Sequence, residues 1–402
     1  MVQEIMSGVK NLKQAIMPII WLNCIFCMGI FEIPINRPRY YLSAFYVISM
    51  LTGYFIMLYK EFYIFQQLLI QEFMLYYFVV GVNVLVAVLA IILFWWKSEN
   101  MNNIIKRNSI ADNTLEALGI KSEYQKTFTN ILCFMAIWIA GMITIFITYG
   151  VWAHRDIGYW ALLCHEICLC FPIVINSVVD LTFVSFIRCI QVKFQKTNTL
   201  INNIVQYSAN ESNVFKIYNR HDNTSIAFVM ANYENNKDKM HLIQTLRHLH
   251  LEITRIGQQI NHAYCLQLLL ELAVHFTIVT TNIYCVYCAL FGQLRVIVNN
   301  ERIIAMMVMA CIYLFKITLV NWLCTSVSTE AYKTGEIIQS FEGSSIDNDM
   351  REEIHQFAQQ LVLNPLNFTA ADFFSINNRL TGKFLATVTT YVVILIQMNT
   401  SV

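Results

Sequence analysis

Seven apolar runs constrain the fold of this chain more than any other feature, because each is long enough to cross a lipid bilayer. A membrane-spanning helix needs about 20 mostly apolar residues. The runs cover residues 41–59, 73–96, 128–151, 159–187, 263–291, 303–327 and 380–398. Their charged residues are few: Glu166, Asp180, Glu271, Lys316 and Lys383. The pattern predicts an all-α polytopic membrane protein with seven transmembrane helices.

The composition excludes several classes of protein. The chain is 57% hydrophobic and only 13% charged, whereas soluble domains carry about 25% charged residues. A soluble enzyme and a disordered chain are therefore excluded. The net charge is +1, so nucleic acid is not an expected partner, while membrane lipid is. The cysteines lie in apolar segments without zinc-ribbon spacing, so we expect neither a metal nor a cofactor.

The direction of the chain follows from the number of spans and the size of the loops. Seven spans place the two termini on opposite sides of the membrane. The long loops all fall on one side and carry most of the basic residues, which predicts a cytosolic N-terminus and an extracellular C-terminus. An eighth apolar run, 15–34, contains Pro18 and stops at Pro34, so we expect a membrane-surface or partly inserted helix there.

The cytoplasmic part is predicted to be helical. A seam of apolar residues with heptad spacing runs over 242–260 and continues into the fifth span. Its members are Leu242, Leu246, Leu249, Ile253, Ile256 and Ile260. The seam could hold subunits together or pack within one chain, and we favour subunit assembly. Residues 205–238 are polar and predict a flexible link, and a further helix is expected over 349–363.

The last span carries a short motif, Thr390-Tyr391 followed by five hydrophobic residues and Gln397. This resembles the C-terminal signature of insect gustatory receptors. Residues 367–376 and the entry to the fifth span, from Leu246 to Leu269, are similar to the same family. The resemblance implies a tetrameric ligand-gated cation channel, as a homotetramer or a heterotetramer. It also implies a small tastant as ligand, a plasma-membrane location in chemosensory neuron dendrites, and a central pore lined by the last helix.

On this basis the chain divides into six parts. They are an N-terminal segment (1–40), spans 1–4 (41–187), a cytoplasmic extension and linker (188–262), spans 5–6 (263–327), a cytoplasmic loop with an anchor helix (328–379), and the pore-lining span 7 with a short extracellular end (380–402).

The pore is expected around Gln397, a polar amide late in an apolar helix. Four such amides on a symmetry axis can coordinate cations, while apolar neighbours close the pore by dewetting. The neighbours are Ile394, Val393 and Met398, with Thr390 and Tyr391 completing the predicted pore and gate residues. The family often has Phe where this chain has Met398, which makes the hydrophobic plug smaller.

A ligand pocket is expected in the outer half of the spans. Aromatic walls with a few polar groups suit a small organic molecule, either a sugar or an alkaloid amine. The candidates are Thr280, Tyr284 and Tyr287 on span 5, Trp160, His165 and Glu166 on span 4, and Thr148 and Tyr149 on span 3. The alternative is an aromatic belt with interhelical hydrogen bonds. Deeper in the membrane, Lys316 is expected to pair with Asp180 or Glu271 as a structural clasp.

Other functions fit the residues less well. An odorant-type receptor subunit of the same superfamily is the nearest alternative. A G-protein-coupled receptor would need an extracellular N-terminus, and no Asp/Glu-Arg-Tyr motif closes the third span. A transporter usually has inverted repeats, which are missing here. A membrane enzyme would need a catalytic constellation, so we expect no enzymatic activity.

Overall fold

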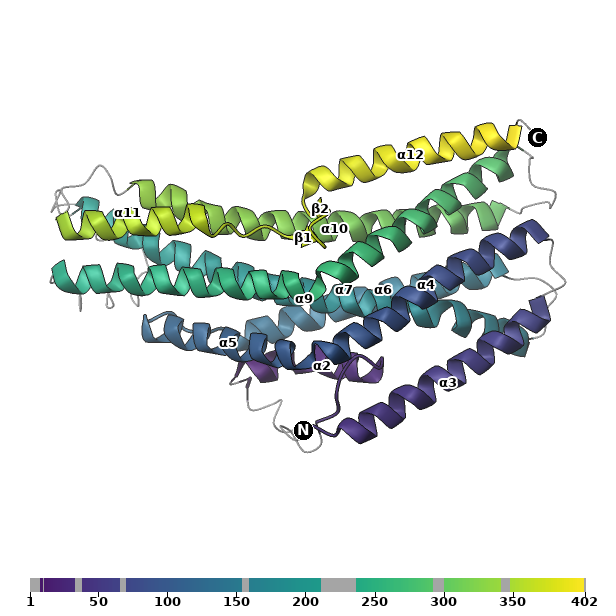
Figure 1. Cartoon of the computed structure of the whole chain (residues 1–402), viewed down its shortest axis with the longest axis horizontal. Coiled ribbons are helices and arrows are strands. Elements are labelled where there is room, and N and C mark those ends of the chain that lie inside the picture. Colours follow the sequence, from purple (N-terminus) through teal and green to yellow (C-terminus); the bar gives the residue numbers. More distant parts are fainter. Residues whose placement is uncertain are drawn as a thin grey trace.

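We describe the protein from a computed structural model, in which residues 8–9, 11–32, 38–65, 70–153, 159–210, 236–291, 300–340 and 348–400 are placed. Within these ranges the chain is mostly helical, and the helices run roughly along one long axis (Figure 1). Seven of them are long and apolar enough to cross a membrane, which confirms the predicted fold class. They are α3 (Tyr40–Phe65), α4 (Ile70–Trp96), α6 (Tyr124–Ala153), α7 (Tyr159–Asn210), α9 (Asn236–Leu290), α10 (Asn300–Gln339) and α12 (Asn378–Thr400).

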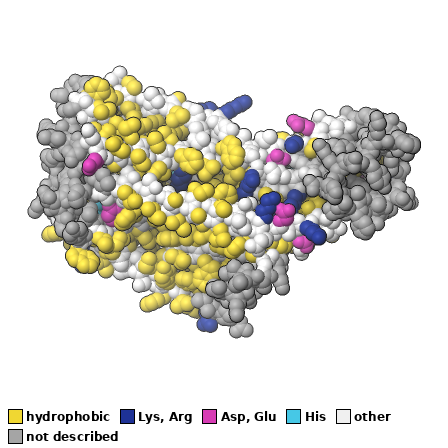
Figure 2. Space-filling view, turned by 180° about the vertical axis from the view of Figure 1, so that it is seen from behind, with side chains coloured by type: hydrophobic (Ala, Val, Ile, Leu, Met, Phe, Trp, Pro, Cys, Tyr) yellow, Lys and Arg dark blue, Asp and Glu magenta, His cyan; other side chains and the backbone are white. Residues whose placement is uncertain are grey.

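The surface of the molecule separates into two regions (Figure 2). Hydrophobic side chains cover much of the broad end, while Lys, Arg, Asp and Glu gather mainly where the molecule narrows. Helix α3 illustrates the broad end, because Tyr41, Phe45 and Ile48 are all exposed. An apolar surface of this extent is stable against lipid rather than water. The broad end is therefore the membrane-spanning part.

Helices α7, α9 and α10 continue well beyond the thickness of a membrane. The 55 residues of α9 extend over about 80 Å, whereas the hydrocarbon core of a bilayer is about 30 Å thick. Helices α5 (Ser98–Ala117) and α11 (Asn348–Leu363) lie beside these extensions, and α11 matches the helix predicted over 349–363. The predicted link 205–238 is helical at both ends, because α7 continues to Asn210 and α9 begins at Asn236. Residues 211–235 lie outside the described ranges.

The apolar seam predicted over 242–260 is buried inside a single chain. Its six members are Leu242, Leu246, Leu249, Ile253, Ile256 and Ile260, and all are buried. They belong to one hydrophobic core that also includes Phe194 of α7 and Phe357 of α11. Because the chain itself covers these side chains, a partner subunit cannot reach them. The seam therefore does not support the assembly role that we predicted from it, and packing within one chain is correct.

Helix α2 (Leu12–Ile25) accounts for part of the eighth apolar run and continues through Pro18. Val9 donates its backbone N–H to Gln125 at the beginning of α6, and Phe26 contacts Trp138 further along α6, with ring centroids 6.3 Å apart. Helix α2 therefore lies along α6 and runs in the same direction. This placement favours a partly inserted helix over one that lies flat on the membrane surface.

A small β-hairpin, which the sequence analysis did not predict, connects α11 to α12. Its antiparallel strands are β1 (Thr369–Ala370) and β2 (Phe374–Ser375). Ala371 and Asp372 in its turn have φ angles of 48° and 60°. The Asn261 side chain of α9 accepts a hydrogen bond from the Thr369 N–H (3.0 Å) and donates one to the Thr369 hydroxyl (3.2 Å). The hairpin thereby fixes the beginning of α12 to α9.

The burial of the seam predicts how its residues respond to truncation. Leu249→Ala removes a fully covered side chain, and such changes cost about 2–5 kcal/mol of stability. We expect a clear fall in the melting temperature of the detergent-solubilised protein, measured by fluorescence-detected size-exclusion chromatography. Leu363→Ala on α11 is the matched control, because Leu363 is exposed. Equal melting temperatures for the two variants would contradict the buried seam.

Candidate functional site

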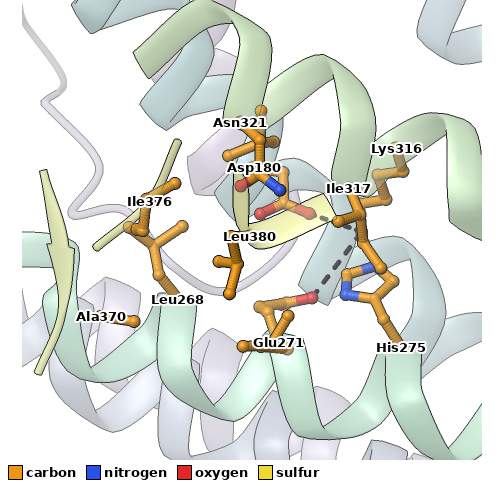
Figure 3. Close-up of a pocket in the computed structure, with 12 residues that line it drawn as sticks. Asp180, Leu268, Glu271, His275, Lys316, Ile317, Asn321, Ala370, Ile376 and Leu380 are labelled. Carbon is orange, nitrogen blue, oxygen red and sulfur yellow. Dashed lines mark ion pairs between the residues drawn. The ribbon is translucent and has the colours of Figure 1, made fainter. Parts of the chain in front are cut away.

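A cluster of ionisable side chains lies in the interior of the spanning bundle, where α7, α9 and α10 meet (Figure 3). The Lys316 ammonium of α10 is 2.5 Å from Asp180 Oδ2 of α7 and 3.7 Å from Glu271 Oε2 of α9. Both carboxylates are buried. The predicted clasp is confirmed, and Lys316 pairs with both acids rather than with one. The Gln267 amide also donates to Glu271 Oε1 at 3.3 Å.

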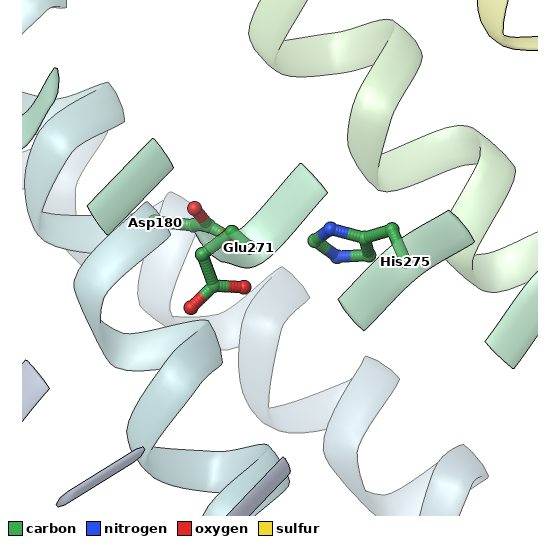
Figure 4. Close-up of side chains that lie close together, drawn as sticks. All are labelled: Asp180, Glu271 and His275. Carbon is green, nitrogen blue, oxygen red and sulfur yellow. The ribbon is translucent and has the colours of Figure 1, made fainter. Parts of the chain in front are cut away.

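His275 joins this cluster one turn after Glu271 on α9 (Figure 4). One ligand atom from each of Asp180, Glu271 and His275 lies within 4.8 Å of the others, a spacing that could hold a metal ion. Carboxylate oxygen and imidazole nitrogen are donors that suit zinc. The Lys316 ammonium, however, already lies against both carboxylates, so a metal ion would have to displace it. We therefore interpret the cluster as an ion-pair network.

The cluster lies directly beside the beginning of α12. It borders a small cavity of about 40 Å³, whose other walls include Ile376 and Leu380 (Figure 3). On α10, the Asn321 amide donates a hydrogen bond to the Thr381 hydroxyl of α12 (2.9 Å). The Thr325 hydroxyl accepts a bond from the Asn378 N–H (3.0 Å). The helix that carries Lys316 therefore also holds the first turn of the last span.

A second buried ionisable pair lies further along the bundle. Glu61 Oε1 of α3 is 2.7 Å from His165 Nδ1 of α7, and both side chains are almost fully buried. The sequence analysis singled out His165 but missed Glu61, because it ended the first span at residue 59. The two residues are 104 positions apart, so no local pattern could have joined them. His275 was also missed, although its position four residues after Glu271 in an apolar span was a usable signal.

Glu166 lies next to this pair and against α6. A Cβ atom at Gly150 would be 3.0 Å from Glu166 Oε1, so the absence of a side chain at residue 150 lets the carboxylate approach α6 closely. Oε1 has no hydrogen-bond partner among the described residues. Thr148, half a turn before Gly150, is buried and donates to the Thr144 carbonyl at 2.6 Å. His165 and Glu166 therefore lie where α7 meets α6, whereas Thr148 lies on the opposite face of α6 from Gly150.

The remaining predicted ligand residues lie elsewhere on the helices. Thr280 is buried on α9, and its hydroxyl has no hydrogen-bond partner among the described residues. Tyr284 and Tyr287 are half-buried further along α9, and the Tyr287 ring lies 4.5 Å from that of Phe291. Trp160 is 86% exposed. The side chain of the eighth candidate position, 149, is outside the described part of the chain.

Helix α12 has one covered face and one open face. Phe384, Val388 and Val392 are buried at spacings of four, and the Phe276 ring of α9 contacts Tyr391 with centroids 5.3 Å apart. The other predicted pore residues are exposed on the single chain: Thr390, Val393, Ile394, Gln397 and Met398. Thr390, Ile394 and Gln397 have spacings of four and three, so they share one face of the helix. This open face carries the predicted pore residues.

These features describe a membrane protein with seven spanning helices, three of which extend well beyond the membrane on one side. The chain belongs to the 7tm chemosensory receptor family, which matches residues 19–400. The family resemblance inferred from the last span is therefore confirmed. The chain is a multi-pass membrane protein of the insect chemoreceptor superfamily, which is a receptor family and not an enzyme family.

Similar proteins include two receptors of Drosophila melanogaster. Putative gustatory receptor 28b is 21% identical over 316 residues, which cover 76% of this chain and 65% of that receptor. Gustatory and pheromone receptor 32a is 30% identical over 151 residues, which cover 38% of this chain and 32% of that receptor. The chain thus spans less than two thirds of the length of these relatives.

The fold also resembles a solved structure. The insect olfactory receptor OR5 from Machilis hrabei superposes with a TM-score of 0.67 and 14% identity, over 96% of this chain and 98% of that receptor. The structure of the same receptor in complex with eugenol gives a TM-score of 0.69 with 13% identity and the same coverage. The two chains therefore share one fold.

The ion-pair network predicts a strong effect of removing its cation. Lys316→Gln leaves two buried carboxylates without their partner, and breaking a buried pair on one side is strongly destabilising, by about 3–5 kcal/mol. We expect a low melting temperature and poor surface expression. The double variant Lys316→Gln/Asp180→Asn should recover part of the loss, because it removes one of the unpaired charges. Lys333→Gln, at an exposed position on the same helix, should behave like the parent.

Proposed function

We propose that this protein is a gustatory-type receptor that acts as a ligand-gated, non-selective cation channel in the plasma membrane. The observation that carries this proposal is the open face of α12, where Thr390, Ile394 and Gln397 lie exposed on the single chain. A spanning helix that shows polar groups on an uncovered face needs water or another subunit against it. A central pore formed by several copies of α12 supplies both.

In this arrangement Gln397 determines how cations pass through the pore, and its apolar neighbours determine how the pore closes. The four Gln397 amides of a tetramer can replace part of the hydration shell of a cation. Ile394, one turn before Gln397, and Met398 narrow the same passage and exclude water in the closed state. Val393, Thr390 and Tyr391 form the walls next to this constriction. The N-terminus is cytosolic and the C-terminus extracellular, so Gln397 lies near the outer mouth.

The proposed assembly is a homotetramer or a heterotetramer with related receptors. The seam over 242–260 is covered within one chain, so the subunits contact each other through other surfaces. The open face of α12 and the exposed residues of α10 and α11 are the surfaces that fit this role. Phe315 and Trp322 of α10 are exposed large side chains on such a surface.

The pore assignment is tested by cysteine accessibility. Gln397→Cys should be modified by a charged extracellular thiol reagent faster when an agonist is present, because opening wets the constriction. Val392→Cys is the matched control on the covered face of the same helix and should stay unmodified. Modification of Gln397→Cys that is absent, or indifferent to agonist, would falsify the assignment of Gln397 to the pore.

Substitutions in the same helix should separate conduction from closure. Gln397→Ala should change the unitary conductance or the relative cation permeability, with little change in the half-maximal agonist concentration. Ile394→Ala and Met398→Ala should raise the basal current, because a wider and less apolar constriction stays wetted. These quantities are measured by recording currents from cells that have no receptor channel of their own. If both Ala variants had the same basal current as the parent, Ile394 and Met398 would not form the gate.

The ligand pocket is proposed in the outer half of the bundle, within each subunit. Glu166 and Thr280 each bring a buried polar atom that lacks a hydrogen-bond partner among the described residues, and buried polar atoms without partners are costly. A ligand hydroxyl or ammonium group would satisfy them. The ligand is a sugar or a bitter compound, since a carboxylate with aromatic neighbours fits both.

Single substitutions should locate this pocket. Glu166→Gln, Thr280→Ala, Tyr284→Ala and Tyr287→Ala should each raise the half-maximal agonist concentration at normal surface expression, by about 5-fold or more where a hydrogen bond is lost. Trp160→Ala is a useful comparison, because Trp160 is mostly exposed. A panel of sugars, bitter compounds and odorants should be applied, since an odorant-type subunit would respond only to the last group. Unchanged dose–response curves for all four variants would place the pocket elsewhere.

A further inference from the structure

A large cavity lies at the cytoplasmic end of the bundle, away from α12 and from the outer half. Its volume is about 730 Å³, which falls in the range typical of ligand pockets, about 300–1,000 Å³. Helix α2 forms one wall and α5 the facing wall, and the ends of α4 and the middle of α7 close it. Helix α2 packs mainly on α6, which leaves space between α2 and α5.

The two ends of this cavity differ in chemistry. One end, near the spans, includes Phe94 of α4 and Phe186 of α7, with the polar Thr182 and Ser185 beside Phe186. The other end is lined by α5 as it leaves the membrane region, and it includes Asn102, Lys106 and Asn113. These three residues have spacings of four and seven, so they lie on one face of α5. The cavity is therefore amphipathic, with its polar end directed away from the spans.

The polar end carries an excess of positive charge. Lys13 of α2 lies at the cavity and pairs with Glu32 at 2.9 Å. Lys106 of α5 is exposed and makes no ion pair with any residue that the structure describes. Glu32 is the only acidic residue among the described lining, so the two lysines outnumber it. An anionic group at this end would be stabilised by both lysines.

A buried amide on the cavity wall lacks a hydrogen-bond partner for its oxygen. Asn23 of α2 is only 7% exposed, and its Nδ2 donates to the Ile19 carbonyl (2.8 Å) and to the Thr182 hydroxyl (2.9 Å). Its Oδ1 has no hydrogen-bond partner among the described residues. A buried acceptor without a donor costs about 1–3 kcal/mol. Asn23 lies beside Thr182 of α7 and about 15 Å along α2 from Lys13, so this acceptor belongs to the part of the cavity near the spans and not to the end with the lysines.

We propose that this cavity is a binding site for one anionic phospholipid of the cytosolic leaflet. The phosphate and its headgroup lie at Lys106 and Lys13, and an acyl chain lies against Phe94 and Phe186. The negatively charged cytosolic leaflet attracts basic groups at this depth. The leaflet assignment rests on the topology proposed above, whereas binding itself requires no channel activity. A free phosphate compound would leave the apolar half of the cavity empty, so the lipid is the better fit.

Native mass spectrometry of the purified receptor tests the proposal. Phosphatidylserine and phosphatidylcholine with identical acyl chains are added at matched concentrations, and soluble inositol phosphate serves as the free-phosphate arm. The parent should retain phosphatidylserine selectively. Lys106→Gln should weaken phosphatidylserine binding about 5-fold. Ile20→Trp fills the cavity from the α2 wall and should abolish the binding of either lipid there.

Two controls keep the result interpretable. Lys126→Gln removes an exposed lysine at the beginning of α6, outside the cavity, and should bind phosphatidylserine like the parent. Melting curves identify any variant that fails to fold, and Lys106→Gln should fold normally because Lys106 is exposed. Equal binding of both lipids by the parent, or binding that is unchanged in both Lys106→Gln and Ile20→Trp, would overturn the proposal. So would competition by inositol phosphate that displaces the lipid completely, because that outcome assigns the site to a soluble ligand.

Discussion

Lys316, Asp180 and Glu271 can remain charged inside a membrane only while they stay together, because an isolated charge in hydrocarbon is very costly. Each comes from a different long helix, so the pairing links α7, α9 and α10 at one level of the bundle. The remaining helices then pack around this unit: α4 and α6 against α7, and α12 against α9 and α10. The extensions beyond the membrane belong to the same three helices, so the network also limits how far these helices can shift along one another.

Much of the fold could be predicted because its signals are local. The seven spans follow from the length of the apolar runs, and the buried seam follows from heptad spacing. The pairing of Lys316 was predicted because Asp180 and Glu271 have the same expected depth and the long lysine side chain can extend toward them. Heptad spacing alone does not indicate which surface covers the seam, however, since a neighbouring helix of the same chain and a partner subunit satisfy it equally. Whether the same chain covers the seam depends on the packing of α7, α10 and α11, which are distant from the seam in sequence.

The features that could not be predicted depend on long-range packing or on unusual backbone. The β-hairpin before α12 has Ala371 and Asp372 with positive φ, where glycine or asparagine would have been the recognisable signal. Glu61 and His165 are far apart in the chain, and only the packing of α3 against α7 brings them together. For the candidate site, the open face of α12 followed from helical spacing. The shape of any cavity did not, because it depends on how side chains from several helices fill space.

The attachment of α12 at its beginning has a mechanical consequence. Hydrogen bonds to α10 and the hairpin on α9 hold the helix near Thr381, while its far end around Gln397 has an open face. The helix is therefore held most firmly at its beginning, while the face that carries Gln397 is exposed on the single chain. At 1.5 Å per residue the tip is about 24 Å from the base, so a tilt of about 5° displaces it by about 2 Å. A small tilt about the attached end would therefore move the exposed face around Gln397 by a distance comparable to the radius of a water molecule.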